Sequence, residues 1–104
     1  MNKLLATLGI ARRANKISIG ETLIKEITNK KVFLVVIASD ASAGSIKMIT
    51  NKCKYYDVEY VIILNKSDIA KSISKSLVSA VGIKDRNLAI KFKMNMKEGG
   101  FIEK

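Results

Sequence analysis

The chain has 104 residues, enough for one domain with its own core and too few for two. Its 19 Lys and Arg residues against 9 Asp and Glu give a net charge of +10, so a polyanionic partner is expected, nucleic acid first and an anionic membrane surface second. The sequence has no histidine and one cysteine, Cys53, which argues against an internal disulfide, a metal site and most routine enzyme chemistry.

No apolar run approaches the roughly 18–20 residues needed to cross a bilayer. The first 14 residues predict a helix rather than a signal peptide, because Arg12 and Arg13 follow the apolar part and no cleavage pattern is present. A lone cysteine fits a reducing compartment. We therefore expect a cytoplasmic protein with no metal and no cofactor.

The first half of the chain alternates between helix and strand periods. One helix is expected to end near residues 14–15 and a second to begin near Gly20, where Ser18 and Glu21 have the spacing of a capping box. The β-branched run 32–38 predicts a strand covered on both faces. Ser or Asp residues then precede a helix with a single apolar stripe, formed by Ile46, Ile49, Cys53 and Tyr56.

The second half repeats the alternation. Residues 59–64 predict a buried strand, a short helix starts at residues 65–68, and residues 77–83 predict another strand. Asp85 can cap a last helix, and the tail from residue 93 is expected to be basic and flexible. The pattern predicts an α/β fold, a three-layer α/β/α sandwich with a small mixed sheet, in one domain (1–104) whose core spans about residues 4–92.

Four segments, in order, resemble one known family. They are residues 8–16 (Leu-Gly-Ile-Ala-Arg-Arg-Ala-Asn-Lys), 18–21 (Ser-Ile-Gly-Glu), 35–42 (Val-Val-Ile-Ala-Ser-Asp-Ala-Ser) and 49–58 (Ile-Thr-Asn-Lys-Cys-Lys-Tyr-Tyr-Asp-Val). They resemble the ribosomal protein L-seven-Ae and L-thirty-e superfamily, and within it the bacterial YlxQ-like group. The resemblance implies an α/β/α sandwich without catalytic activity that binds kink-turn RNA, a sharply bent internal loop flanked by sheared G·A pairs.

The resemblance also implies where RNA binds. The family's helix motif, Gly-x-Asn-Glu followed after two residues by Lys, falls on Ile19, Gly20, Glu21, Thr22 and Lys25, and its loop before the last strand falls on Lys75, Ser76 and Leu77. Lys25 keeps the family's charge, which suits a phosphate. Glu21 replaces the family's Asn and only accepts hydrogen bonds when ionised, whereas Asn also donates.

Each candidate has a structural alternative. Glu21 can serve only as part of the capping box, Lys25 as a solvated helix lysine, and Leu77 as a core residue of its strand. Arg12, Arg13 and Lys16 lie just before the proposed binding helix and suit phosphate, although cations also suit a helix C-terminus.

Other side chains have weaker functional alternatives. Lys47, Lys52 and Lys54 are interpreted as solvated charges unless they share a face. Tyr55 and Tyr56 can offer stacking platforms, although Tyr56 lies on the apolar stripe, and Cys53 is interpreted as a small core residue.

Two other functions stay open: an α/β enzyme or phospho-receiver-like switch using Asp40 and Lys84, and a protein-interaction module with incidental RNA affinity. Against the first, the sequence lacks an acidic cluster for magnesium and a glycine-rich phosphate loop. We predict no catalytic residue. The expected partner is structured RNA, ribosomal or another kink-turn-containing RNA and possibly the ribosome itself, with neither DNA nor a membrane, and the chain is expected to be a monomer.

Overall fold

The computed structural model describes residues 2–75 and 77–98. Helices and short strands alternate within them, as expected. In chain order they are α1 (Lys3–Arg13), β1 (Ile17–Ser18), α2 (Gly20–Thr28), β2 (Leu34–Ile37), α3 (Ala43–Tyr55), β3 (Tyr60–Ile62), α4 (Lys66–Ser72), β4 (Ala80–Ile83) and α5 (Arg86–Glu98).

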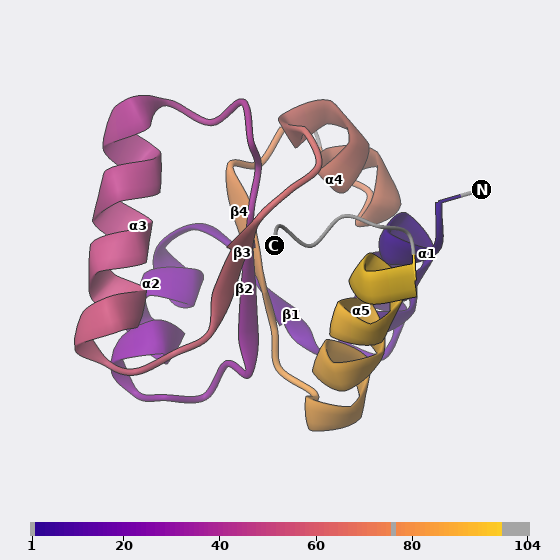
Figure 1. Ribbon diagram of the computed structural model, residues 1–104, viewed down its shortest axis with the longest axis horizontal. Helices are drawn as coiled ribbons and strands as arrows, with labels where there is room; N and C mark the ends of the chain where they lie inside the picture. The colour runs from indigo at the N-terminus through magenta and orange to yellow at the C-terminus, as the bar shows by residue number, and fades with distance from the viewer. Residues whose placement is uncertain (1, 76, 99–104) are drawn as a thin grey trace.

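The four strands form one mixed sheet in the order β1-β4-β2-β3. β2 and β3 are parallel, whereas β4 is antiparallel to both β1 and β2. Helices α2 and α3 cover one face of the sheet, and α1, α4 and α5 cover the other (Figure 1). This arrangement confirms the predicted three-layer sandwich.

Both faces of the central strand β2 are buried. Leu34 and Val36 pack with the helices α1, α4 and α5, whereas Val35 and Ile37 pack against α2 and α3. A strand covered on both sides needs apolar residues at every position, which explains the unbroken run in the sequence.

Gly82 in β4 allows α2 to lie close to the sheet. A Cβ atom at this position would lie 2.6 Å from Leu23 Cδ1 and 2.9 Å from Val32 Cγ1. Real Cβ atoms do not approach other heavy atoms so closely, so glycine at this point fixes the height of α2 above the sheet.

The ends of α1 and α4 set the start of two loops that carry predicted RNA-binding residues, Lys16 after α1 and Lys75 after α4. Both end in a Schellman motif, in which the residue after the C-cap has a positive φ: 60° at Asn15 and 59° at Ser74. The next N–H then bonds back to the last turn, Lys16 N–H to Ala11 O at 2.8 Å and Lys75 N–H to Ala70 O at 2.9 Å. Lys16 and Lys75 therefore begin their loops from fixed positions.

Several local predictions were wrong. Ser18 does not cap α2: it lies in β1, a strand that the sequence analysis missed, and its buried hydroxyl has no hydrogen-bond partner. The predicted strand at residues 59–64 is the short β3, which within the described residues pairs only with β2 and stays partly exposed. The helix α5 continues to Glu98, so the tail is helical where looseness was expected from residue 93, and residues 99–104 lie outside the described part.

Candidate nucleic-acid interface

Two grooves meet at the N-terminus of α2. The first holds about 450 Å³ and is basic, with Arg12, Thr22 and Lys75 on its walls and Ser18 among its other lining residues. The second is largely apolar and lies between α2, α3 and the loop before β4, with Glu21, Met48 and Leu77 on its walls. Ile19 lines both grooves and forms the ridge between them.

The N-terminus of α2 has no side-chain cap. Its N-cap residue, Ile19, accepts no hydrogen bond through its side chain, so the first N–H groups of the helix are not satisfied by a cap. Gly20 has a φ of 61°, a left-handed conformation that favours glycine, although a Cβ at this position would meet nothing within 4 Å. The uncapped helix end and the bare glycine make the backbone accessible to a bound partner.

Arg12 is held in place by the backbone after α4. Its Nε–H donates to the carbonyl oxygen of Ile73 at 3.0 Å, across a sequence separation of 61 residues. The remaining guanidinium donors stay available beside Lys75, which lines the same groove. This single bond brings a cation of the first helix next to a cation of the loop before β4.

The structure brings most of the remaining helix and loop candidates to the two grooves, whereas Lys25 lines neither of them. Glu21 and Thr22 are exposed and line the two grooves on either side of the ridge, and Lys25 is exposed one turn after Glu21. Leu77 is 61% exposed, so its interpretation as a core residue was wrong. Ser76 lies outside the described residues.

Arg12, Arg13 and Lys16 do not form one cluster. Arg13 lines a different groove, between α1 and α4, together with Lys71 and Asp68. Lys16 lines neither groove at α2, although its carbonyl oxygen accepts a 2.7 Å bond from the N–H of Lys84. Adjacent residues of a helix point about 100° apart, which separates Arg12 from Arg13.

Asn15 and Met48 also line these grooves, although neither was among the predicted site residues. Met48 lies off the apolar stripe of α3 and is 46% exposed. A long apolar side chain on the polar face of a helix was the available signal for it.

The polar residues of the enzyme alternative lie apart. Asp40 follows β2 and Lys84 follows β4, and these strands are antiparallel, so the two residues lie at opposite ends of the sheet. Asp40 Oδ1 accepts from the N–H of Lys66 at 2.8 Å, and Lys84 Nζ pairs with Glu26 at 3.1 Å. Both side chains therefore have structural partners, and the two residues do not form the shared site that the enzyme alternative would need.

Cys53 is fully buried, and burial raises the pKa of its thiol to about 11. A neutral, buried thiol is unreactive, in agreement with the core role predicted for it. Within residues 2–75 and 77–98, no three His, Cys, Asp or Glu side chains are grouped as a metal site would require. None of the helices in these ranges is long and apolar enough to cross a membrane.

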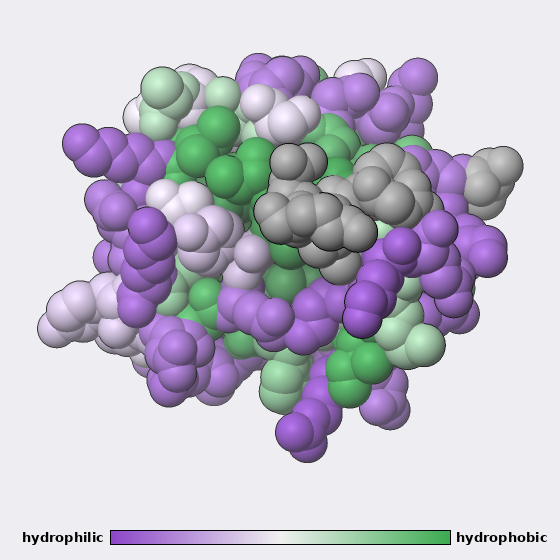
Figure 2. Space-filling view, viewed as in Figure 1, coloured by the Kyte–Doolittle hydropathy of each residue, from purple (hydrophilic) through white to green (hydrophobic). Residues whose placement is uncertain are grey.

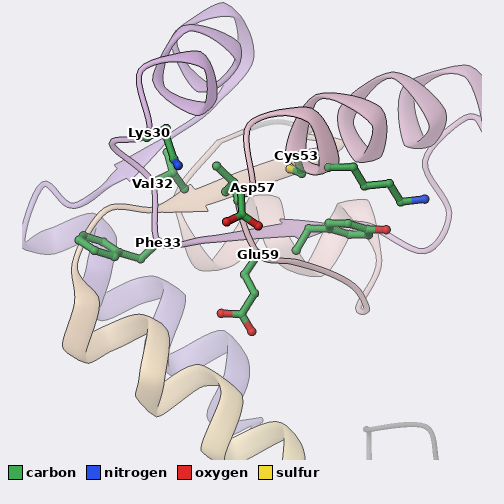
Figure 3. Close-up of a pocket in the computed structure, with 9 residues that line it drawn as sticks. Lys30, Val32, Phe33, Cys53, Asp57 and Glu59 are labelled. Carbon is green, nitrogen blue, oxygen red and sulfur yellow. The ribbon is translucent and has the colours of Figure 1, made fainter.

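A hollow of about 740 Å³ at the opposite end of α3 is less suited to a ligand (Figure 3). Its labelled side chains do not converge: Phe33 and Glu59 project in different directions, and Glu59 pairs with Lys93 at 2.7 Å. Lys93 does not line this hollow, so Glu59 already has a partner outside it, and none of the predicted site residues lines it; the grooves at α2 remain the stronger candidate.

Comparison with known proteins decides the family. The model of the Ribosomal protein L7Ae/L30e/S12e/Gadd45 family matches residues 2–92. The chain belongs to this family. Two relatives are named RNA-binding protein YlxQ: that of Bacillus subtilis (strain 168) is 40% identical over 85 residues, 81% of this chain and 85% of the relative, and that of Enterococcus faecium is 35% identical over 92 residues, 88% of each chain. The family assignment confirms the predicted resemblance.

Two solved structures share the fold of this chain. A protein of unknown function from Bacillus halodurans C superposes with a TM-score of 0.88 at 28% identity, covering 93% of this chain and 99% of that one. The Giardia lamblia 15.5kD RNA binding protein has the same fold, with a TM-score of 0.73 at 22% identity over 91% of this chain and 82% of that one. The names of the two YlxQ relatives given above describe RNA binding and no reaction, in agreement with the expectation of a non-catalytic protein.

Proposed function

We propose that the protein is an RNA-binding protein that recognises a kink-turn with the two grooves at the N-terminus of α2. The observation that carries this proposal is the convergence of predicted residues from three distant segments: Arg12 from α1, Glu21 and Thr22 from α2, and Lys75 and Leu77 from the loop before β4. Membership of a family with relatives named for RNA binding supports it.

The basic groove would hold the RNA backbone. Arg12 and Lys75 line one groove beside the uncapped end of α2, and a helix N-terminus with cations beside it favours phosphate. The guanidinium of Arg12 can form forked bonds to phosphate oxygens, while Lys25 and Lys75 act as point charges. These contacts fix the position of the RNA and carry no sequence information.

The apolar groove would hold a base that has left the stack. Leu77 and Met48 present half-exposed apolar walls, and RNA loops are commonly read through unstacked bases packed on such surfaces. Glu21 lines the same groove, and its carboxylate can accept from the amino group of guanine or cytosine. Glu21 would therefore select a base with an exocyclic amino group at this point.

Variants of the groove walls test the proposal against a standard kink-turn RNA. Leu77→Ala and Lys75→Ala are expected to weaken binding about five- to tenfold, which corresponds to roughly 1 kcal/mol each. Lys91→Ala is the matched control, because Lys91 is an exposed lysine of α5 that lines neither groove. Equal effects of Lys75→Ala and Lys91→Ala would mean that only net charge matters, and the proposed site would be wrong.

We further propose that the RNA is ribosomal and that the protein acts in the cytoplasm. The support is the ribosomal-protein family to which the chain belongs. Sedimentation of the purified protein with ribosomal subunits at physiological salt tests this. A protein that stays at the top of the gradient while binding an isolated kink-turn would require another RNA partner.

A further inference from the structure

The outer face of α3 combines cations, apolar side chains and an aromatic ring. The long exposed side chains of this face recur within one arc of the helix, and they are those of Lys47, Met48, Asn51, Lys54 and Tyr55. No acidic residue occurs anywhere in α3. The helix lies at the edge of the molecule (Figure 1), and hydrophilic side chains project from that side of the space-filling view (Figure 2). Because the residues of this face are exposed, the face is turned away from the sheet.

Tyr55 is the most exposed large hydrophobic residue of the described part, at 81%. Its ring meets Tyr56 in an edge-to-face contact, with centroids 4.8 Å apart and an interplanar angle of 78°. Tyr56 is itself half-buried against the core under α2 and α3. The contact therefore steadies the Tyr55 ring from one side and leaves a ring face open to solvent.

We propose that this face of α3 is a second RNA-contact surface, which binds unpaired nucleotides that extend from the kink-turn. The inference rests on the proposed function, because Met48 belongs both to this face and to the apolar groove that would hold the unstacked base. Met48 and Tyr55 are seven residues apart, or about 10 Å along the helix. At about 3.4 Å per nucleotide of a stacked strand, that distance accommodates about three nucleotides.

The charges favour RNA over a protein partner. Lys47 and Lys54 lie two turns apart on this face, and the ion pairs of the described residues involve neither. Protein interfaces are depleted in lysine, whereas a single strand is commonly held by cations along its backbone and aromatic rings under its bases. Lys47 and Lys54 would hold phosphates, and Tyr55 would stack on a base.

The test compares a kink-turn RNA with versions that carry a four-nucleotide single-stranded extension, placed in turn at each strand end. One extension is expected to raise the affinity of the wild-type protein about tenfold (1.4 kcal/mol). Tyr55→Ala should reduce this gain below twofold, whereas Tyr55→Phe should keep it because the ring remains. Met94→Ala, an exposed apolar truncation on α5, is the matched control and should leave the gain unchanged.

The outcomes separate the two proposals. Equal binding of extended and plain RNA by the wild type, with no effect of Tyr55→Ala, overturns the α3 surface and leaves kink-turn recognition intact. A hexauridylate provides the independent arm: about tenfold weaker binding by Tyr55→Ala supports the α3 surface even if the kink-turn itself is not recognised. If Tyr55→Ala abolishes only binding to a protein and changes no RNA affinity, the surface is a protein interface and the inference is wrong.

Discussion

The position of α2 above the sheet depends on Gly82, and Gly82→Ala is predicted to destabilise the protein. The new Cβ would lie 2.6 Å from Leu23 Cδ1, 2.9 Å from Val32 Cγ1 and 3.1 Å from Ser18 Oγ. Leu23, Val32 and Ser18 are all at least 95% buried, so none can move out of the way without disturbing the core. Overpacking of this kind costs about 1–3 kcal/mol.

For a domain of this size, a loss of about 2 kcal/mol lowers the melting temperature by roughly 8 °C. Thermal unfolding followed by circular dichroism measures the shift. Gly44→Ala is the matched control, because a Cβ there would meet nothing within 4 Å and alanine favours the helix α3. It is expected to stabilise the protein by about 0.5 kcal/mol.

Leu23 belongs to α2, so the same substitution should also disturb RNA binding. If α2 moves to relieve the contact, Glu21 and Thr22 move with it. The affinity for kink-turn RNA is then expected to fall at temperatures where the variant is still fully folded. An unchanged melting temperature for Gly82→Ala would refute the reasoning, because it would mean that the helix rests on the sheet without close contact at this glycine.

Three further substitutions test other parts of the account. Ser74→Gly is expected to stabilise the protein by about 1 kcal/mol in urea unfolding, since Ser74 has a φ of 59°; a loss of stability would mean that its conformation carries no strain. Ser18→Ala is expected to be neutral or slightly stabilising in the same assay, because the buried hydroxyl has no partner, and a cost above about 1 kcal/mol would reveal one. The thiol of Cys53 has a pKa of about 11 in the folded protein, against an ordinary value of 9.0. Burial of the neutral thiol therefore contributes fully to the free energy of unfolding below pH 9. This contribution is lost as the pH rises towards 11, because the thiol of the unfolded chain ionises first. The stability difference between wild type and Cys53→Ala should shrink over that range, and a constant difference would contradict the burial effect.

Local features of the fold were predictable because the residues that encode them act on their own neighbours. Two predicted caps are confirmed: Ser42 Oγ accepts from Ser45 N–H at 3.1 Å, and Asp85 Oδ2 accepts from Leu88 N–H at 2.9 Å. The short helix predicted to start at residues 65–68 is capped by Asn65, whose Oδ1 accepts from Asp68 N–H at 2.7 Å. The unbroken apolar run of β2 likewise predicted that this strand is buried on both faces, and all four of its residues are buried.

Features defined by distant partners were not predictable. The strand β1 has two residues and exists because Ile17 and Ser18 pair with Ile83 and Gly82 of β4. The spacing of Ser18 and Glu21 suggested a cap, but pairing with β4 placed Ser18 in the sheet instead. Asp40 also finds its partner far along the chain, at the start of α4, where no local pattern indicates it.

The sequence predicted only some of the residues that meet at the candidate site. Resemblance to the family brought Thr22, Lys75 and Leu77 together, and the structure places them around one ridge. Arg12 and Arg13 were grouped because they are adjacent, although adjacent helix positions face different directions. Helical geometry applied to this pair would have separated them before the structure was known.

The most direct test of the central claim is a titration against a kink-turn RNA and a plain duplex of equal length across a salt series. A net charge of +10 attracts any RNA at low salt, and only a difference that persists at physiological salt reports recognition of shape. We predict that the kink-turn binds at least about tenfold more tightly there (about 1.4 kcal/mol) and that Lys25→Ala weakens it. Equal binding of both RNAs, fading together as salt rises, would contradict kink-turn recognition and leave a general binder of the RNA backbone.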